Sequence, residues 1–265
     1  MQALRTIISS KFINKGIRTC EACNAQVPII EVEGQEYSHC LNCDNKKLET
    51  EMSQFKEEVD KEQCSRLFEK YSIIPSSLKK AQFDTYIPKS ETQHRALTTT
   101  QWYAENFEQI LKGYEWNSLL LKGSYGVGKS HLSHAVAQEL KRKGYNVIFI
   151  DTPSLLQMIR DGYRGKEKVE SDIFKKLANV DLLVLDDIGA EYVKSEDGKE
   201  SWGSEIIFRI TSSRTDKPNI FTTNYGSKEL KEKYGLHGGR IVSRMSEKTK
   251  KVEIEGEDYR VRGWK

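Results

Sequence analysis

The stretch "LLLKGSYGVGKSHLSHAV", residues 119–136, decides the fold of this chain. Gly123, four intervening residues, Gly128, Lys129 and Ser130 form the pattern G-x-x-x-x-G-K-S between an apolar run and an amphipathic segment. The glycines matter because backbone N–H groups must turn inward and close on phosphate oxygens, which a Cβ would obstruct. The order of these segments predicts a strand, a phosphate-binding loop and a helix whose positive N-terminal end faces the same anion.

The side chains of this loop predict a nucleotide site. Lys129 is expected to reach the β- and γ-phosphates of ATP, and Ser130 to bind a magnesium ion. A chance glycine turn is the alternative, and the strand and helix patterns on either side argue against it. The residues expected to contact the nucleotide are Gly123, Ser124, Tyr125, Gly126, Val127, Gly128, Lys129, Ser130 and His131.

The composition predicts a soluble, cytoplasmic protein without a membrane partner. Charged residues make up 31% and apolar residues 37% of the 265 residues, and no apolar run reaches membrane-spanning length. The mean hydropathy is −0.65. The opening "MQALRTIISSKFINKG" lacks the apolar core of a signal peptide. A net charge of +3 is too small to indicate nucleic-acid binding by itself, so any basic surface must be local.

Four of the five cysteines have the spacing of a zinc site. Cys20 and Cys23 lie in "CEAC", and sixteen residues separate them from Cys40 and Cys43 in "HCLNC". Four thiolates complete a closed tetrahedral shell, which predicts a structural zinc ion. Disulfides are the alternative, which a reducing cytosol disfavours. His39 is a candidate substitute ligand. The fifth cysteine, Cys64, is expected to be an ordinary thiol.

The rest of the chain predicts an α/β domain behind a linker. Residues 46–70 are dense in Lys and Glu, which predicts a solvated helix. Beyond it, apolar runs alternate with amphipathic stretches, as in buried parallel strands joined by helices. The predicted limits are a zinc-binding domain over 1–46, a charged helical linker over 47–74 and a nucleotide-binding domain over 75–265. The expected strands are "SLLLK", "NVIFI", "DLLVLD", "NIFTT" and "KVEIE".

Two further strand ends carry polar side chains that fit the nucleotide site. The run before Asp186 and Asp187 is apolar, so two carboxylates lie at the edge of a buried strand and need a cation or a partner. The first can bind magnesium and the second can act as general base toward water, although a helix cap is an alternative role. Thr223 and Asn224 end the next strand, where the amide can position that water or simply form a turn.

Four motifs in this order resemble a known family. "GSYGVGKS", "LLVLDDIGAE", "FTTN" and "GGRIVSRM" are similar to the AAA+ ATPases of the DnaC/DnaI helicase-loader group, including phage versions and the related IstB transposition helpers. The similarity covers residues 73–265, including "FDTYIPKSETQHRAL" before the first strand. A preceding zinc module resembles the DnaI-type loaders. The implied fold is a P-loop AAA+ domain with a parallel sheet.

The resemblance implies roles for individual residues. Lys129 and Ser130 match Walker A, Asp186 and Asp187 match Walker B, and Asn224 matches sensor 1. The family's arginine finger, which acts on the ATP of a neighbouring subunit, corresponds to Arg244, and its sensor 2 to Arg260; a surface ion pair is the alternative for either arginine. The sequence departs from the family's pattern in two ways. Walker B ends in Asp-Asp, which favours slow hydrolysis. Only about forty residues follow Asn224, which implies a reduced or absent C-terminal lid.

The resemblance also implies partners. Loaders of this kind assemble with ATP on a hexameric replicative helicase and single-stranded DNA, so we expect self-association into a ring or spiral and a zinc domain that contacts the helicase. The stretch matching the family's DNA-contacting insertion has four basic and two acidic residues from Arg160 to Lys168. Cations with an interleaved aromatic suit phosphate contact and base stacking, although a solvated helix end fits equally well. The candidate DNA contacts are Arg160, Tyr163, Arg164 and Lys166.

Two other functions remain open at this point. One is a nucleotide-gated DNA-binding adaptor in which ATP fixes an assembly and turnover is incidental. The other is an IstB-like transposition helper. Turnover stimulated by single-stranded DNA separates a loader from an adaptor, and binding to a hexameric helicase separates a loader from a transposition helper.

Overall fold

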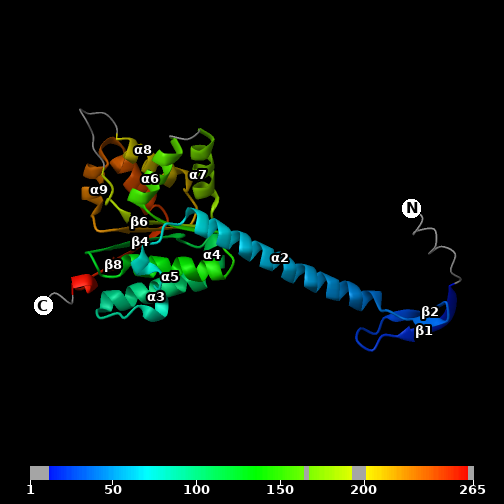
Figure 1. Ribbon diagram of the computed structural model, residues 1–265. Helices are drawn as coiled ribbons and strands as arrows, with labels where there is room; N and C mark the ends of the chain where they lie inside the picture. Colours follow the sequence, from blue (N-terminus) through cyan, green and yellow to red (C-terminus); the bar gives the residue numbers. More distant parts are fainter. Residues whose placement is uncertain (1–11, 164–166, 193–200, 262–265) are drawn as a thin grey trace. The chain divides into compact units, whose positions relative to one another are not determined.

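The computed structural model describes residues 12–163, 167–192 and 201–261, and the chain divides into two units (Figure 1). The first unit runs from Met1 to Asp60 and the second from Lys61 to Lys265. Among the described residues, no helix has the length and apolar character that crossing a membrane requires.

The first unit is a small antiparallel sheet followed by a helix. Its strands are β1 (Ile13–Thr19), β2 (Gln26–Val32) and β3 (Gln35–Tyr37), in the order β1-β2-β3. The buried core among its described residues consists of Val27 with Cys20 and Cys40. A core of this size stabilises little by itself, so the unit needs a further constraint.

Helix α2 (Leu41–Tyr71) belongs partly to each unit, because the division falls between Asp60 and Lys61. It begins directly after Cys40, whose carbonyl accepts the N–H of Asp44 at 3.0 Å. The predicted helix at 46–70 therefore starts five residues earlier than expected. In the second unit Cys64 is buried and its thiol donates to the carbonyl of Gly144 at 3.0 Å.

The second unit contains a five-stranded parallel sheet in the order β5-β6-β7-β4-β8. All five apolar segments predicted as strands form this sheet, which confirms the predicted fold class. Parallel strands in this order bring their carboxyl ends to one edge, where ligands of such sheets bind. The strands are β4 (Ser118–Gly123), β5 (Val147–Asp151), β6 (Leu182–Ile188), β7 (Asn219–Thr223) and β8 (Thr249–Ile254).

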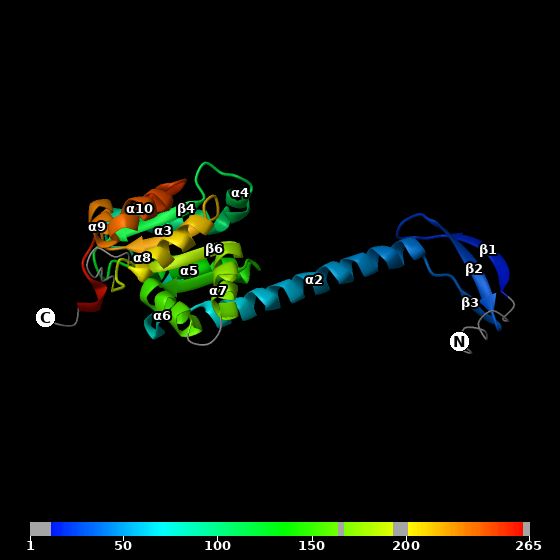
Figure 2. The same cartoon turned by 90° about the horizontal axis from the view of Figure 1, so that it is seen from above.

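Helices cover both faces of the sheet (Figure 1). On one face, α3 and α5 pack on the strand residues Leu182 and Val184; on the other, α6, α7, α8 and α10 pack on the alternating residues Leu183 and Leu185. Both faces are therefore apolar, which explains the continuous apolar runs in the sequence. Seen from above, α9 and α10 lie next to each other (Figure 2). The helices are α3 (Glu91–Glu105), α4 (Phe107–Leu111), α5 (Lys129–Arg142), α6 (Thr152–Tyr163), α7 (Glu167–Asn179), α8 (Trp202–Ser213), α9 (Ser227–Lys233) and α10 (Gly238–Ser246).

The described residues after β8 form one short helical turn, Tyr259–Val261. No α-helix follows β8 within residues 255–261, and a reduced or absent lid stays a prediction.

Candidate functional site

The phosphate loop between β4 and α5 requires glycine at Gly128, for its backbone conformation, and at Gly123, for lack of space. Gly128 has φ of +97°, and a Cβ built there would lie 2.3 Å from the ring of Tyr86. A Cβ on Gly123 would lie 2.1 Å from the carbonyl oxygen of Ile254 in β8. The loop is therefore held between the segment before the sheet and the last strand, with α5 beginning at Lys129.

Lys129 is buried within the loop, with 6% of its surface exposed. Its ammonium Nζ donates to the carbonyls of Gly123 at 3.1 Å and Ser124 at 2.7 Å, and to Oδ1 of Asn224 at 2.6 Å. Burial lowers the pKa of Lys129, and the nearby carboxylate of Asp187 opposes that shift. The lysine thus lies in the loop with all its donors directed at oxygen atoms, which is the environment that phosphate oxygens would supply.

Asp186 is the more buried of the two acidic residues in β6, with 5% exposure. Its Oδ1 accepts the hydroxyl of Thr222 at 2.7 Å, and it also has a side-chain hydrogen bond with Ser130. Burial raises the pKa of Asp186 to about 6, and these two hydrogen bonds only partly offset it. A buried carboxylate beside a hydroxyl is a pair of hard oxygen ligands, which fits a magnesium ion.

Asp187 has a different orientation, because its backbone is left-handed with φ of +57°. The β6–β7 register shifts between Leu185 and Ile188, so β6 bulges at the acidic pair. Asn224 donates from Nδ2 to Oδ1 of Asp187 at 3.0 Å, while its own Oδ1 accepts Lys129. The three predicted residues from β6, β7 and the phosphate loop therefore form one hydrogen-bonded chain.

A cavity of about 600 Å³ lies next to the three hydrogen-bonded residues Lys129, Asn224 and Asp187. The phosphate loop from Tyr125 to His131 lines it, together with Asp187 and Asn224. One wall comes from residues 77–87, including Leu78, Ala81 and Ile87. The space therefore has a polar end suited to phosphates and an apolar wall suited to a flat base.

The sequence did not identify this wall as part of the site. The segment is attached to the loop by the Tyr86 hydroxyl, which donates to the carbonyl of Val127 at 3.0 Å. His131 pairs with the carbonyl of Gln82 at 2.8 Å, and the buried His134 with that of Ala81 at 3.2 Å. Two short helical turns, Ser76–Leu78 and Phe83–Thr85, shape it, and such turns have little sequence signal of their own.

The two candidate arginines lie in different places. Arg260 lines the cavity, in a segment where the N–H of Tyr259 donates to the carbonyl of Gly126 at 3.2 Å. Arg244 is in the last turn of α10 and does not line this cavity. It is half-exposed and pairs with Glu247 at 3.1 Å, so within this chain it forms the surface ion pair that the sequence left open.

A buried carboxylate that the sequence analysis missed supports the bulge. Glu191 is 2% exposed and accepts the hydroxyl of Thr152 at 2.6 Å, the N–H of Gly189 at 3.0 Å and the hydroxyl of Tyr234. The hydroxyl of Thr152 also lies 3.0 Å from the carbonyl of Asp187. Glu191 thus ties the turn after β6 to the first residue of α6 and to the residue that follows α9. The acid in "DDIGAE" is a weak signal, since nothing in the sequence shows that it is buried.

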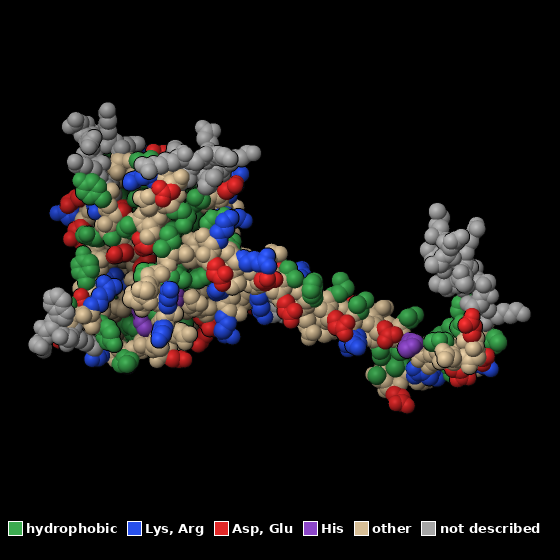
Figure 3. Space-filling view, in the orientation of Figure 1, with side chains coloured by type: hydrophobic (Ala, Val, Ile, Leu, Met, Phe, Trp, Pro, Cys, Tyr) green, Lys and Arg blue, Asp and Glu red, His purple; other side chains and the backbone are tan. Residues whose placement is uncertain are grey.

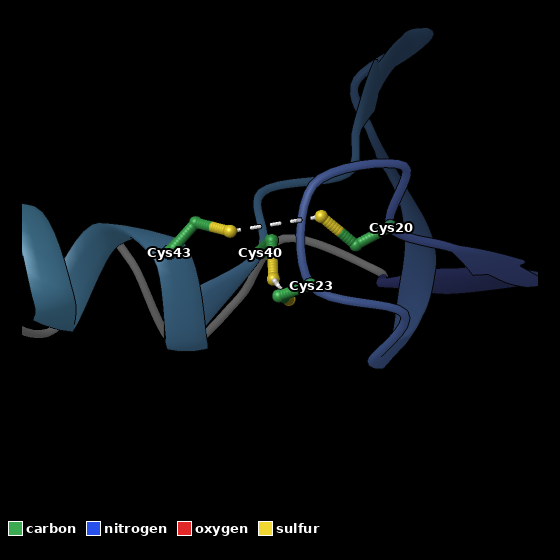
Figure 4. A group of neighbouring side chains, drawn as sticks. All are labelled: Cys20, Cys23, Cys40 and Cys43. Atoms are coloured by element: carbon green, nitrogen blue, oxygen red, sulfur yellow. Dashed lines mark hydrogen bonds between the residues drawn. The ribbon is translucent and has the colours of Figure 1, made fainter.

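The four cysteines form one cluster in the first unit (Figure 4). Their sulfur atoms lie within 4.8 Å of one another, with Cys20 to Cys43 at 3.7 Å and Cys23 to Cys40 at 3.4 Å. Thiolates around one tetrahedral zinc ion, at about 2.3 Å from it, are about 3.8 Å apart, so the cluster fits zinc. A disulfide needs about 2.05 Å, so the disulfide alternative is wrong. His39 is not part of the cluster.

The candidate DNA contacts are only partly within the described residues. The guanidinium of Arg160, at the end of α6, lies 5.2 Å from the ring centroid of Trp202 in α8. The side chains of Tyr163, Arg164 and Lys166 lie outside the described residues. The proposed pairing of cations with an aromatic for DNA therefore stays a prediction.

A phosphate loop, a bulged acidic pair and a strand-end asparagine on a parallel sheet define a nucleotide-binding P-loop protein of the AAA+ class. The chain belongs to the family described as IstB-like ATP binding protein, which matches residues 110–265.

Its similar proteins include helicase loaders. The replicative helicase loader DnaC of Escherichia coli (strain K12) is 30% identical over 181 residues, which are 68% of this chain and 68% of that protein. The replicative helicase loader DnaI of Bacillus subtilis (strain 168) is 25% identical over 60% of this chain and 51% of its own length. The crystal structure of the DnaC helicase loader aligns with a TM-score of 0.56 over 68% of this chain and all of that chain, at 30% identity.

Replacing one thiolate should release a bound metal. We expect about one zinc ion per chain in the purified protein, and loss of that zinc from Cys40→Ser, because the closed shell loses a ligand and the unit has little other core. Metal analysis by mass spectrometry measures this. Cys64→Ser, which changes a thiol outside the cluster, is the control and should keep its zinc. Zinc-free wild-type protein from metal-sparing purification would rule the centre out.

Proposed function

We propose that this chain is an ATP-dependent loader that binds a hexameric replicative helicase and delivers it to single-stranded DNA. The similarity to a replicative helicase loader over 68% of both chains carries this proposal, and the Walker A and Walker B patterns of the sequence support it. The four-cysteine cluster of the first unit supports it, since a zinc domain ahead of the ATPase resembles the DnaI type.

In the proposed site the phosphates of ATP lie in the loop from Gly123 to Ser130. The ammonium of Lys129 would exchange the carbonyls of Gly123 and Ser124 for β- and γ-phosphate oxygens, which hold the same position with greater charge. Ser130 and Asp186 would hold magnesium, which when bound neutralises phosphate charge. The base would lie against the apolar wall near Leu78 and Ile87.

Hydrolysis in this proposal depends on Asp187 and Asn224. Asp187 accepts a proton from the attacking water, and Asn224, which already donates to Asp187, positions that water. An aspartate reaches less far than the glutamate usual in this class, so we expect slow turnover. Arg260, which lines the same cavity, would contact the γ-phosphate.

The partner surfaces are proposed for separate parts of the chain. Residues 1–46 contain five basic and five acidic residues, and this balance of charge favours a protein partner over DNA for the zinc domain. Single-stranded DNA would contact the stretch from Arg160 to Lys168, with Tyr163, Arg164 and Lys166 as the remaining candidate contacts. Self-association would bring Arg244 of one subunit to the ATP of the next.

Recovery of a replicative helicase tests the loader function. With ATP, the tagged full chain should capture a hexameric helicase from a bacterial lysate, identified by mass spectrometry, and should raise the amount of that helicase on circular single-stranded DNA. Cys40→Ser should lose capture while retaining ATP binding. Capture of a transposase in place of a helicase would favour the transposition helper, and the absence of any turnover with DNA present would favour the adaptor.

Two substitutions separate nucleotide binding from hydrolysis. Lys129→Ala should weaken ATP binding by about tenfold or more, because the cation directed at the phosphates is removed. Asp187→Asn should bind ATP normally and lose turnover by about 10²-fold, because an amide cannot accept a proton. Fluorescent-nucleotide titration and phosphate release measure the two effects. Unchanged affinity of the first variant, or normal turnover of the second, would refute the corresponding role.

Mixing two inactive variants tests whether Arg244 acts in trans. Arg244→Ala should bind ATP as a monomer yet lose turnover on the order of 10³-fold in the assembly, because transition-state charge loses its guanidinium. A mixture with Lys129→Ala regains interfaces that pair an intact loop with an intact Arg244, so phosphate release should recover. Glu247→Gln is the control, since it removes only the ion pair within the chain. A mixture that assembles and stays inactive would exclude this role.

A further inference from the structure

Large apolar side chains are exposed along the part of α2 that belongs to the first unit. Figure 3 shows hydrophobic and acidic side chains next to each other along this helix. A solvated linker helix does not need them, and exposed apolar side chains grouped on one element indicate an interaction site. Their exposed fractions are 73% for Leu41, 55% for Leu48, 63% for Met52 and 68% for Phe55.

These side chains follow a heptad pattern. Leu41, Leu48 and Phe55 are seven residues apart and take the d positions, and Met52 and the half-buried Val59 take a positions. Asn45 completes the series at an a position, where a polar residue fixes register in coiled coils. At 100° per residue the six side chains fall within about 80° around the helix. We call this face, from Leu41 to Val59, the α2 stripe.

The α2 stripe is not a continuation of the face by which α2 packs in the second unit. There Cys64 and Phe68 are buried, and Leu67 and Tyr71 are partly buried against the two cores. These four residues centre about 130° around the helix from the stripe. The apolar face therefore changes direction between Val59 and Cys64, and the stripe suits a different occupant.

The charges beside the α2 stripe identify that occupant. All three g positions are acidic, namely Asp44, Glu51 and Glu58, while the e positions include Glu49 and Lys56. Residues at g and e lie beside the partner helix, and because the e positions carry no net charge, the acidic g flank attracts a helix whose facing flank is basic.

A second copy of this chain is a poor match. An antiparallel pair would place Glu51 against Glu51 and Glu49 against Glu49. A parallel pair would place Asp44 against Glu49, with only Glu51 and Lys56 attracting each other.

We propose that the α2 stripe is a docking surface for one amphipathic helix of a partner protein, with apolar residues in heptads and Lys or Arg on the flank that faces the acidic g positions. Leu48, Met52 and Phe55 supply the apolar contact, and Glu51 and Glu58 select that basic flank. This inference goes beyond the proposed function, because it names the chemistry of a helical partner and requires neither ATP binding nor hydrolysis.

Two synthetic helical peptides test this docking with the full chain. Both are about three heptads long with Leu at a and d and Asn at one a position; one has Lys at e and g, the other Glu. We expect the Lys-flanked peptide to bind about tenfold or more tightly than the Glu-flanked one at physiological salt, measured by fluorescence anisotropy. Phe55→Gln and Leu48→Gln should each remove most of this binding, whereas Gln54→Ala, on the opposite face of the helix, should not.

Charge reversal distinguishes binding along the α2 stripe from general attraction between opposite charges. Glu51→Lys with Glu58→Lys should reverse the preference toward the Glu-flanked peptide, while the control Lys46→Glu, outside the g and e positions, should leave the preference unchanged. Helix content by circular dichroism confirms that each variant remains folded. Failure of both peptides to bind, equal binding of the two, or binding that survives Phe55→Gln would overturn the proposal. Sedimentation that shows a dimer abolished by Phe55→Gln would overturn it in favour of a second copy. ATP binding is measured in parallel, so loss of the proposed nucleotide function is scored separately.

Discussion

One hydroxyl group, that of Thr222 in β7, orders the nucleotide site. It donates to the carboxylate of Asp186 and accepts the N–H of Asp187, so it bonds to two consecutive residues of the neighbouring strand. A regular strand would direct consecutive side chains to opposite faces of the sheet. The bulge at this point, with the left-handed backbone of Asp187, lets both acids serve one site.

The backbone conformation of the bulge costs free energy, and hydrogen bonds next to the bulge stabilise it. A left-handed backbone at a residue other than glycine costs on the order of 1 kcal/mol, and it persists only when its surroundings fix it. Glu191 supplies that support by accepting hydrogen bonds from Thr152, Gly189 and Tyr234. As a fully bonded buried carboxylate it stays satisfied, whereas Asp186, whose pKa burial raises, remains the acid that a cation would stabilise. Both acids are buried, so it is their hydrogen bonding that separates the roles of Glu191 and Asp186.

The sequence was sufficient where a local pattern determines the structure. Five apolar runs predicted five strands, the glycine pattern predicted the loop, and cysteine spacing predicted the cluster, because each constraint lies within a few residues. The sequence was insufficient for predicting contacts between residues that are far apart in the chain. Thr222 looks like an ordinary strand residue, and Tyr86 acts through the carbonyl of Val127, forty-one positions away. The role of Arg244 stays a prediction, since its proposed partner belongs to another subunit.

Helix α2 illustrates why apolar periodicity must be interpreted piece by piece. Over the whole length of α2 the apolar residues point in several directions. The helix as a whole therefore has no single apolar face and resembles a solvated linker. Divided at Asp60, it has two consistent faces: Cys64, Leu67, Phe68 and Tyr71 pack in the second unit, and the α2 stripe remains exposed in the first. A uniform linker would require neither face. The change in direction therefore means that one continuous helix meets two different apolar environments, and only the second is supplied by this chain's described residues.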